Sequence, residues 1–125
     1  MVKLHHVQVA MPPGKEEEAR AFYGGLLGLE EVAKPPALAR RGGCWFRRGE
    51  VELHLGVEED FRPARQAHAA LLVDDLDGLA ARLAESGFEP AWDSDLPGHR
   101  RLYTTDPFGN RLELLEVDRP NTRSL

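Results

Sequence analysis

The sequence of 125 residues suits one compact domain or two very small modules, and it is long enough to bury a core without disulfides. Its formal net charge is -5, with no basic stripe, which excludes a nucleic-acid binder whose affinity depends on neutralised phosphates. The single cysteine, Cys44, allows no intrachain disulfide, and its apolar neighbours predict a small buried side chain. Without an apolar signal core or a membrane-spanning stretch, we expect a cytoplasmic protein with no membrane partner.

The first half of the chain is predicted to contain one helix among several strands. The alternating run over 4–11 predicts a strand that ends at a Pro-Pro-Gly turn. Residues 15–27 begin with three consecutive glutamates and then place apolar residues at helical spacing, which predicts a helix. The other expected elements are a strand over 29–34 and a hairpin with strands over 43–47 and 51–55.

The same order of elements is predicted again after a polar segment. Residues 57–66 contain a proline and several charges, so we interpret them as a linker. A strand is expected over 67–73, followed by a helix over 76–85 whose leucines share one face. The last expected elements are a short strand over 88–92, a hairpin with strands over 100–105 and 111–117, and a loose polar tail over 118–125.

Two pairs of residues recur at nearly constant spacing. Glu52 precedes Glu113 by 61 positions and His6 precedes His68 by 62 positions (113 − 52 and 68 − 6). Such spacing predicts two copies of one module related by a pseudo-twofold axis. We therefore predict one α+β domain over 1–125. It is composed of a first module over 4–56, the linker over 57–66, a second module over 67–117 and the tail over 118–125.

Ionisable side chains are predicted on the strand faces opposite to the apolar residues. Because side chains alternate along a strand, the valines and leucines of these strands leave a polar set on the other faces. The residues of that set are His6, Gln8, Glu52, His54, His68 and Glu113. Helices would cover the apolar faces, so the polar faces of two curved sheets are expected to line one cavity.

Four of these side chains form a candidate metal site. Two imidazoles with one or two carboxylates suit a divalent first-row metal that keeps positions open for a substrate. A metal would also offset the cost of burying carboxylates. We therefore predict a site of His6, Glu52, His68 and Glu113. Alternatively, the histidines are satisfied core residues, Glu113 lies on an exposed edge strand, and Glu52 pairs with Arg47.

Further side chains on the same faces are candidates to contact a small-molecule substrate. Arg101 and Tyr103 share one strand face, where a guanidinium and a phenol could hold an anionic or oxygen-rich molecule. Alternatively, they are a solvated arginine and a core tyrosine. Trp45 shares the opposing wall and is interpreted as packing. The predicted substrate-binding residues are Gln8, Arg47, His54, Arg101 and Tyr103.

Residues 4–117 resemble the vicinal-oxygen-chelate superfamily, which includes glyoxalase I, fosfomycin-resistance thiol transferases, bleomycin-binding proteins and extradiol dioxygenases. The most specific segment is Asp106-Pro107-Phe108-Gly109-Asn110-Arg111-Leu112-Glu113, because it joins a turn to a strand that carries a ligand. The other resembling segments are 4–10, 21–23, 27–29 and 67–76. The resemblance implies two βαβββ modules that form an incomplete barrel around a metal.

The resemblance also implies which residues bind that metal. It selects His6 rather than His5 on the first strand, His68 on the fifth and Glu113 on the eighth, with Glu52 at the position of a fourth ligand. His54 is the rival fourth group. The implied cofactor is a divalent transition metal, Zn, Ni, Mn or Fe. In this family, chains of this length usually form homodimers whose sites combine modules of two chains.

The sequence is consistent with three functions. The first is a metal-dependent lyase or isomerase acting on a small oxygenated metabolite, with Glu52 or Glu113 as general base. If Glu52 is not a ligand, the remaining set of two histidines and one glutamate suits a thiol transferase or a ring-cleaving dioxygenase. The third is a metal-free protein that sequesters a drug or metabolite. The chain lacks the inserted segments that shape the glutathione pocket of glyoxalase I, and the fold alone does not choose a reaction.

Overall fold

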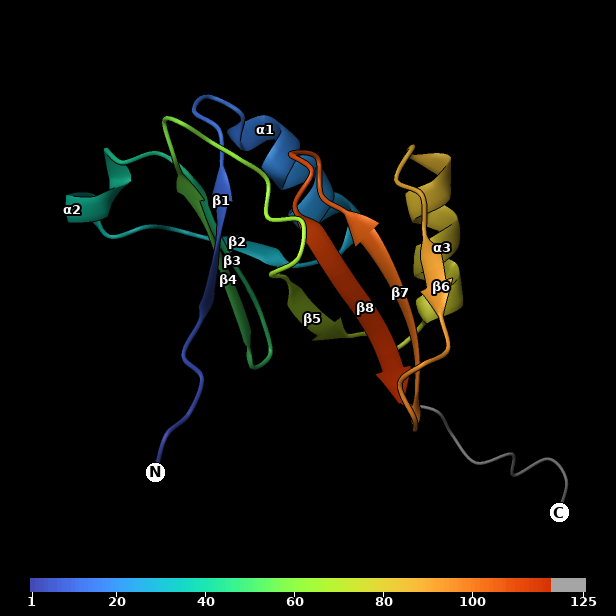
Figure 1. Cartoon of the computed structure of the whole chain (residues 1–125). Coiled ribbons are helices and arrows are strands. Elements are labelled where there is room, and N and C mark those ends of the chain that lie inside the picture. The colour runs from blue at the N-terminus through green and yellow to red at the C-terminus, as the bar shows by residue number, and fades with distance from the viewer. Residues whose placement is uncertain (118–125) are drawn as a thin grey trace, which may run out of the picture.

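The computed structural model describes residues 1–117, so the predicted loose tail lies outside the described residues. Two four-stranded sheets form the molecule, with strand orders β1-β4-β3-β2 and β5-β8-β7-β6 (Figure 1). In each sheet the first strand of the module runs parallel to the last one, and the other neighbours are antiparallel. The α+β class and the repeated βαβββ order are therefore confirmed.

The elements have the following bounds. The first sheet contains β1 (Val7–Met11), β2 (Glu30–Val32), β3 (Cys44–Arg48) and β4 (Val51–Val57), with helical segments α1 (Glu16–Ala19), η1 (Arg20–Leu26) and α2 (Pro36–Ala39). The second sheet contains β5 (Ala69–Leu72), β6 (Ala91–Asp93), β7 (His99–Thr105) and β8 (Arg111–Val117), with helix α3 (Leu76–Glu85). None of the helices within residues 1–117 combines the length and apolar character needed to cross a bilayer.

Several elements differ from the prediction in kind or in bounds. The helix expected over 15–27 changes after one turn into the π-helix η1, where the Leu27 N–H donates to the Phe22 carbonyl. Strand β1 begins at Val7 rather than three residues earlier, so that His5 and His6 precede it. The short helix α2 was not expected, although Pro36 at its first turn is favourable there.

One hydrophobic core connects the two modules. The apolar faces of β4 and β8 both contribute to it, through Leu53 and Leu114 among others. Figure 1 shows α1 and the segment after it between the two sheets, with α3 beside the second sheet, and the buried leucines of α3 belong to the same core. The ring of Phe22 in η1 contacts Phe88 at 4.9 Å between centroids, so η1 joins the modules. Since both apolar faces turn toward this shared core, both polar faces turn away from it.

The turn between β7 and β8 is stabilised by a buried carboxylate. Asp106 is 2% exposed, and its Oδ1 accepts hydrogen bonds from the backbone N–H groups of Phe108 and Asn110, both at 2.9 Å. Its Oδ2 accepts from the Tyr23 hydroxyl at 2.7 Å and from Asn110 Nδ2 at 2.9 Å. Burial raises the pKa of Tyr23 well above its usual value, so the phenol keeps its proton and donates.

The same turn also fastens the linker. Asn110 Nδ2 donates to the Ala10 carbonyl at 2.8 Å, and the Ala64 N–H donates to Asn110 Oδ1 at 2.9 Å. Gly109 adopts φ of 90°, a conformation that favours glycine. The segment 106–113, which carries the family resemblance, therefore links three parts of the chain. Through Asp106 and Asn110 it forms hydrogen bonds to the first module, the linker and the second module, and we call this hydrogen-bonded turn the clasp.

Cys44 is buried, as the sequence predicts, and it is free. Burial raises the pKa of its thiol to about 11, so only about 0.1% of it is thiolate near pH 8. We expect the native protein to react with a disulfide reagent such as DTNB only as fast as the fold opens. Comparison of the labelling rate with the unfolding rate in urea checks this, and rapid labelling of native protein would contradict it.

Candidate metal centre

The polar face of the first sheet carries a stack of three aromatic rings. His54, on β4, lies between His6 and Trp45, with ring centroids 4.1 Å and 3.9 Å apart and interplanar angles of 18° and 3°. His54 is only 4% exposed, and burial lowers the pKa of its imidazole. The neutral ring lies 3.1 Å from Glu52 Oε2 and donates to it through Nε2. The stack therefore holds a histidine and a carboxylate side by side, and leaves little of His54 itself for a ligand.

One group of potential ligands forms on this face, and it includes a residue that strand alternation does not select. His5, His6 and Glu52 offer ligand atoms that all lie within 4.8 Å of one another. His5 Nδ1 lies 2.9 Å from His6 Nδ1 and 3.9 Å from Glu52 Oε2. Because both histidines precede β1, alternation does not force them onto opposite faces, which explains why the sequence pattern missed His5.

The remaining predicted residues of the first sheet lie around this group. Arg47 is exposed and stands opposite Glu52 in the strand register, but within residues 1–117 Glu52 contacts histidines and forms no ion pair with Arg47. Gln8 stands opposite His54 and lies over Gly56, where a Cβ would come within 2.9 Å of the Gln8 amide carbon. The alternative interpretation, in which Arg47 forms an ion pair with Glu52, is therefore wrong for the described residues.

The polar face of the second sheet carries the other imidazole and carboxylate. His68 Nε2 lies 2.9 Å from Glu113 Oε1, and Glu113 is 6% exposed. His68 Nδ1 lies 2.7 Å from the Gln66 carbonyl, which can only accept, so Nδ1 carries the proton. That bond orients the ring with Nε2 toward Glu113. A histidine held through one nitrogen by a backbone carbonyl, with the other aimed at an acid, has the arrangement of a metal ligand.

Arg101 is the second partner of Glu113. Its Nη1 donates to Glu113 Oε2 at 3.3 Å, and its Nη2 forms an ion pair with Asp93 at 2.7 Å. Desolvation lowers the pKa of the guanidinium, but the hydrogen bond to Glu113 and the charge of Asp93 together outweigh it, so the pKa is raised. Arg101 is therefore shared between two carboxylates, whereas the sequence pattern proposes it as a contact for a substrate.

Tyr103 lies between two arginines on the same face. Its ring contacts His68 edge to face at 5.5 Å, with the guanidinium of Arg101 5.2 Å away and that of Arg111 3.9 Å away. The sequence pattern did not select Arg111. Its position two residues before Glu113 on β8 was the signal that could have found it, because residues two apart on a strand share a face.

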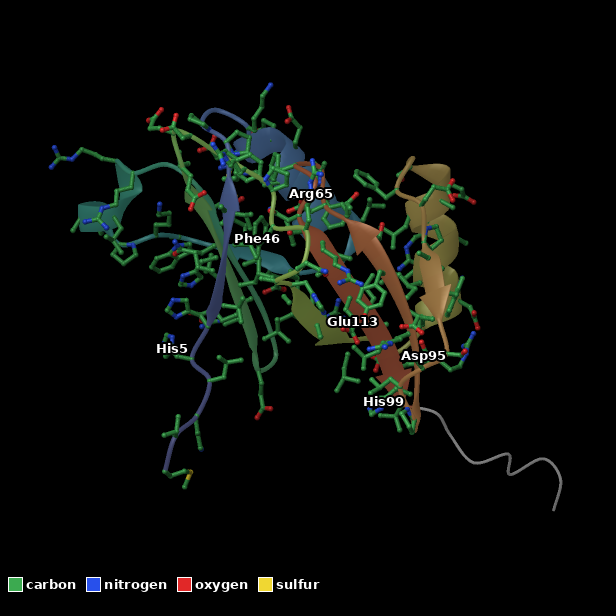
Figure 2. The ribbon with its side chains drawn as sticks, in the orientation of Figure 1. His5, Phe46, Arg65, Asp95, His99 and Glu113 are labelled. Atoms are coloured by element: carbon green, nitrogen blue, oxygen red, sulfur yellow. The ribbon has the colours of Figure 1, made fainter. Side chains whose placement is uncertain are left out.

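The four predicted metal ligands do not converge within one chain. In residues 1–117, the group of His5, His6 and Glu52 is the only set of three or more such side chains close enough to share an ion. Figure 2 shows His5 beside β1 at one side of the molecule and Glu113 in front of β8. A cleft of about 830 Å³ at the junction of the sheets is lined by residues of both, among them His6, Glu52 and His68. The chain thus presents two half-sites, one on each polar face.

Sheet register changes which residue of the first module corresponds to Glu113. In the β1–β4 ladder Gln8 pairs with His54, and in the β5–β8 ladder Ala70 pairs with Glu113. The two half-site histidines each lie two residues before Gln8 and Ala70. Sequence spacing predicts Glu52 as the counterpart of Glu113, but the strand pairing matches His54 with it. The pair His6–His54 in the first sheet therefore corresponds to His68–Glu113 in the second.

By the same register Glu52 corresponds to Arg111. Each lies two residues before the residue that pairs with Gln8 or Ala70, on the polar face of its sheet. The two half-sites are therefore similar in their histidines and opposite in charge at this neighbouring position.

Two four-stranded sheets of the same topology, each with an imidazole and a carboxylate on its polar face, define a two-module α+β protein of the glyoxalase-like class. The chain belongs to the Glyoxalase/Bleomycin resistance protein/Dioxygenase superfamily, whose family model matches residues 3–114.

Solved structures agree with this assignment. A protein from Bacillus anthracis assigned to the glyoxalase family is 48% identical, with a TM-score of 0.89, and the match covers 94% of this chain and 97% of that one. TnmS3, an antibiotic binding protein from Streptomyces sp. CB03234, is 24% identical with a TM-score of 0.70, covering 94% and 99%.

The fosfomycin resistance protein FosX from Listeria monocytogenes, in a complex with Mn(II) and a dihydroxypropylphosphonic acid, is 17% identical with a TM-score of 0.75, covering 94% of each chain. At these identities, TnmS3 and FosX support the fold alone. No curated protein matches the sequence.

Proposed function

We propose that this protein is a metal-dependent enzyme that acts on a small oxygenated molecule. The observation that carries the proposal is the orientation of His68, whose Nδ1 is held by a backbone carbonyl while Nε2 is aimed at the buried Glu113. The donor set of imidazoles and carboxylates fits Zn, Ni, Mn or Fe in the divalent state. The proposed ligands are His6, Glu52, His68 and Glu113.

Glu52 is preferred to His54 as the fourth group because it is accessible. The side chain of Glu52 is 20% exposed, whereas both faces of the His54 ring are covered by other rings. The bond from His54 uses Glu52 Oε2, so Oε1 is left to meet a metal or a proton. We assign His54 the role of orienting Glu52 and His6.

We also propose that the working protein is a homodimer, in which the first-module half-site of one chain faces the second-module half-site of its partner. Within residues 1–117, neither His68 nor Glu113 joins the group of His5, His6 and Glu52, so a second copy would complete each half-site. The segment before β1 supports this arrangement, because Met1, Val2 and Leu4 are large apolar residues that are more than four-fifths exposed. Exposed apolar side chains beside a polar half-site are typical of an interface.

The proposed chemistry is proton transfer next to an oxygen of the substrate, as in a lyase or isomerase. A bound divalent metal would stabilise negative charge that develops on that oxygen. Glu52 would accept the proton, because its carboxylate is accessible and carries no arginine partner within the described residues. Glu113 is not assigned the base, because Arg101 and His68 lie against both of its oxygens. A metal held by Glu113 would take the place of its contact with His68.

The ion pair between Arg101 and Glu113 favours a second function, the metal-free binding of a small molecule. Arg101 compensates the buried charge of Glu113 without any metal ion, and His68 lies within hydrogen-bond distance of its other oxygen. An acid that is already neutralised does not require a metal to offset its burial.

Metal analysis separates the two functions. We expect protein purified without chelators to contain about one transition-metal ion per chain, and His68→Ala to lower its affinity for that metal by about a hundred-fold or more. His99→Ala is the matched control. His99 lies on β7, and its ring contacts the Pro97 carbonyl rather than Glu113.

The second readout is deuterium exchange at carbon next to a carbonyl, followed by NMR in heavy water with α-hydroxycarbonyl compounds. The metal-loaded protein is expected to catalyse exchange, and Glu52→Gln to abolish it. Protein that contains no metal, and whose melting temperature does not change when Zn, Ni, Mn or Fe is added, would instead support the metal-free binder.

A further inference from the structure

We propose that Arg111 and Tyr103 form a subsite for an anionic group, a carboxylate or a phosphonate, on the small molecule that this protein binds. The location of the subsite beside the substrate rests on the proposed function, because it adjoins the His68–Glu113 half-site. The presence of the subsite itself rests only on the contacts and charges of the second sheet.

Arg111 is fixed on the polar face of the second sheet. It stands opposite Thr105 at the start of the β7–β8 ladder, two residues before Glu113. Its guanidinium lies 3.9 Å from the centroid of the Tyr103 ring, and its Nη1 donates to Gln66 Oε1 at 3.0 Å. A planar guanidinium held on an aromatic ring loses less conformational entropy when it binds a carboxylate or phosphonate.

The charge of Arg111 has no acidic partner among residues 1–117. Within residues 1–117, Arg20, Arg100 and Arg101 each form ion pairs with two carboxylates, whereas no carboxylate lies within ion-pair distance of Arg111. The nearest acid along β8, Glu113, is already engaged by Arg101 and His68. In a chain with 21 acidic and 16 basic residues, a half-buried arginine without a carboxylate partner is available to an outside anion.

Tyr103 supplies a second donor at the same place. The guanidinium groups of Arg101 and Arg111 both lie against its ring. In the described part of the chain its hydroxyl has no hydrogen-bond partner. Tyr103 stands opposite Glu113 in the strand register and contacts the ring of His68. An anion held by Arg111 and this hydroxyl would therefore adjoin the half-site histidine. This assigns the anion contact to Arg111, because Arg101 is occupied by Asp93 and Glu113.

The register of the two sheets indicates how a bound molecule would be oriented relative to this subsite. Arg111 corresponds to Glu52 in the first module, so one half-site carries a cation where the other carries an accessible acid. A molecule bound between the halves would meet a proton acceptor on one side and an anion-binding group on the other. The expected substrate class is therefore a small organic acid with an exchangeable C–H and an oxygen beside it.

Anion binding to metal-free protein tests the subsite separately from catalysis. Protein treated with chelator would be titrated calorimetrically with methylphosphonate and acetate, and with neutral glycerol, in chloride buffer of constant ionic strength. We expect the anions to bind and glycerol not to bind. Arg111→Gln should weaken anion binding by about ten- to a hundred-fold. Arg111→Lys should give intermediate binding because it retains the charge without the planar fork.

The matched control is Arg41→Gln, which makes the same change in net charge at an exposed residue outside the site. Tyr103→Phe tests the second donor and should weaken anion binding several-fold with the arginine intact. Circular dichroism and melting temperature would verify that each variant is folded, because Arg111 also ties the linker through Gln66.

Equal anion affinity in folded Arg111→Gln and wild-type protein would overturn the subsite. An equal loss of anion affinity in Arg111→Gln and in Arg41→Gln would also overturn it. Absence of measurable binding of either anion to wild-type protein would overturn it as well. Loss of anion affinity in Arg111→Gln alone supports it, and the ratio of acetate to methylphosphonate affinity decides which acid is preferred. If this pattern holds in protein that never binds a metal, the proposed enzyme fails and the subsite stands.

Discussion

Mixed dimers of His6→Ala and His68→Ala subunits are expected to recover metal binding that neither variant has alone. Each variant by itself carries one damaged half-site in every composite site. In a mixed dimer one site combines both damaged halves, and the other combines both intact halves. Random mixing makes about half of the dimers mixed, so about a quarter of the wild-type metal content should return. The two variants would be unfolded and refolded together so that their subunits exchange. Elemental analysis of the refolded mixture then measures the recovered metal content.

A second mixture is the control for this experiment. His6→Ala and Glu52→Gln both damage the first-module half-site, so no pairing of these two chains produces an intact site. That mixture should remain without metal under the same conditions. Recovery in both mixtures, or in neither, would contradict a site shared between two chains. Sedimentation of the wild-type protein gives an independent check, because a monomer at all concentrations cannot form such sites.

Strand alternation predicted the faces of this fold well because alternation is a local property. The side chains of His54, Glu113, Arg101 and Tyr103 lie on the polar faces that the period of two assigns to them. The order of elements followed from turn residues and apolar spacing for the same reason. The π-helical turn of η1 could not be predicted in this way, because it depends on how Phe22 and Tyr23 pack in the tertiary core.

The sequence did not determine the register of the paired strands or the ion-pair partners of the polar side chains. The spacing of Glu52 and Glu113 suggested equivalence, but the offset between paired strands differs by three residues in the two modules (54 − 8 and 113 − 70), which makes His54 the counterpart. The pairing of Arg101 with Asp93 depends on strand β6, which begins later than the sequence predicts. The half-sites turn apart because the apolar faces share one core, a consequence of how the modules pack.

Asp106→Ala is expected to be among the most destabilising single substitutions in the chain. The carboxylate is 2% exposed and accepts four hydrogen bonds, from two backbone N–H groups, the Tyr23 hydroxyl and the Asn110 amide. Its removal leaves these buried donors without an acceptor at the junction of the two modules and the linker. We expect the free energy of unfolding to fall by about 3 kcal/mol or more and the melting temperature by about 10 °C.

Tyr23→Phe separates the loss of one bond from the loss of the clasp. It removes only the hydroxyl that donates to Asp106 and keeps the ring, which is 2% exposed, in the core. The expected cost is about 1 kcal/mol, well below that of Asp106→Ala. Urea unfolding of both variants under identical conditions gives the two values. If Asp106→Ala cost no more than Tyr23→Phe, the backbone donors of the turn would have found water, and the turn would be a surface loop rather than the fastening between modules.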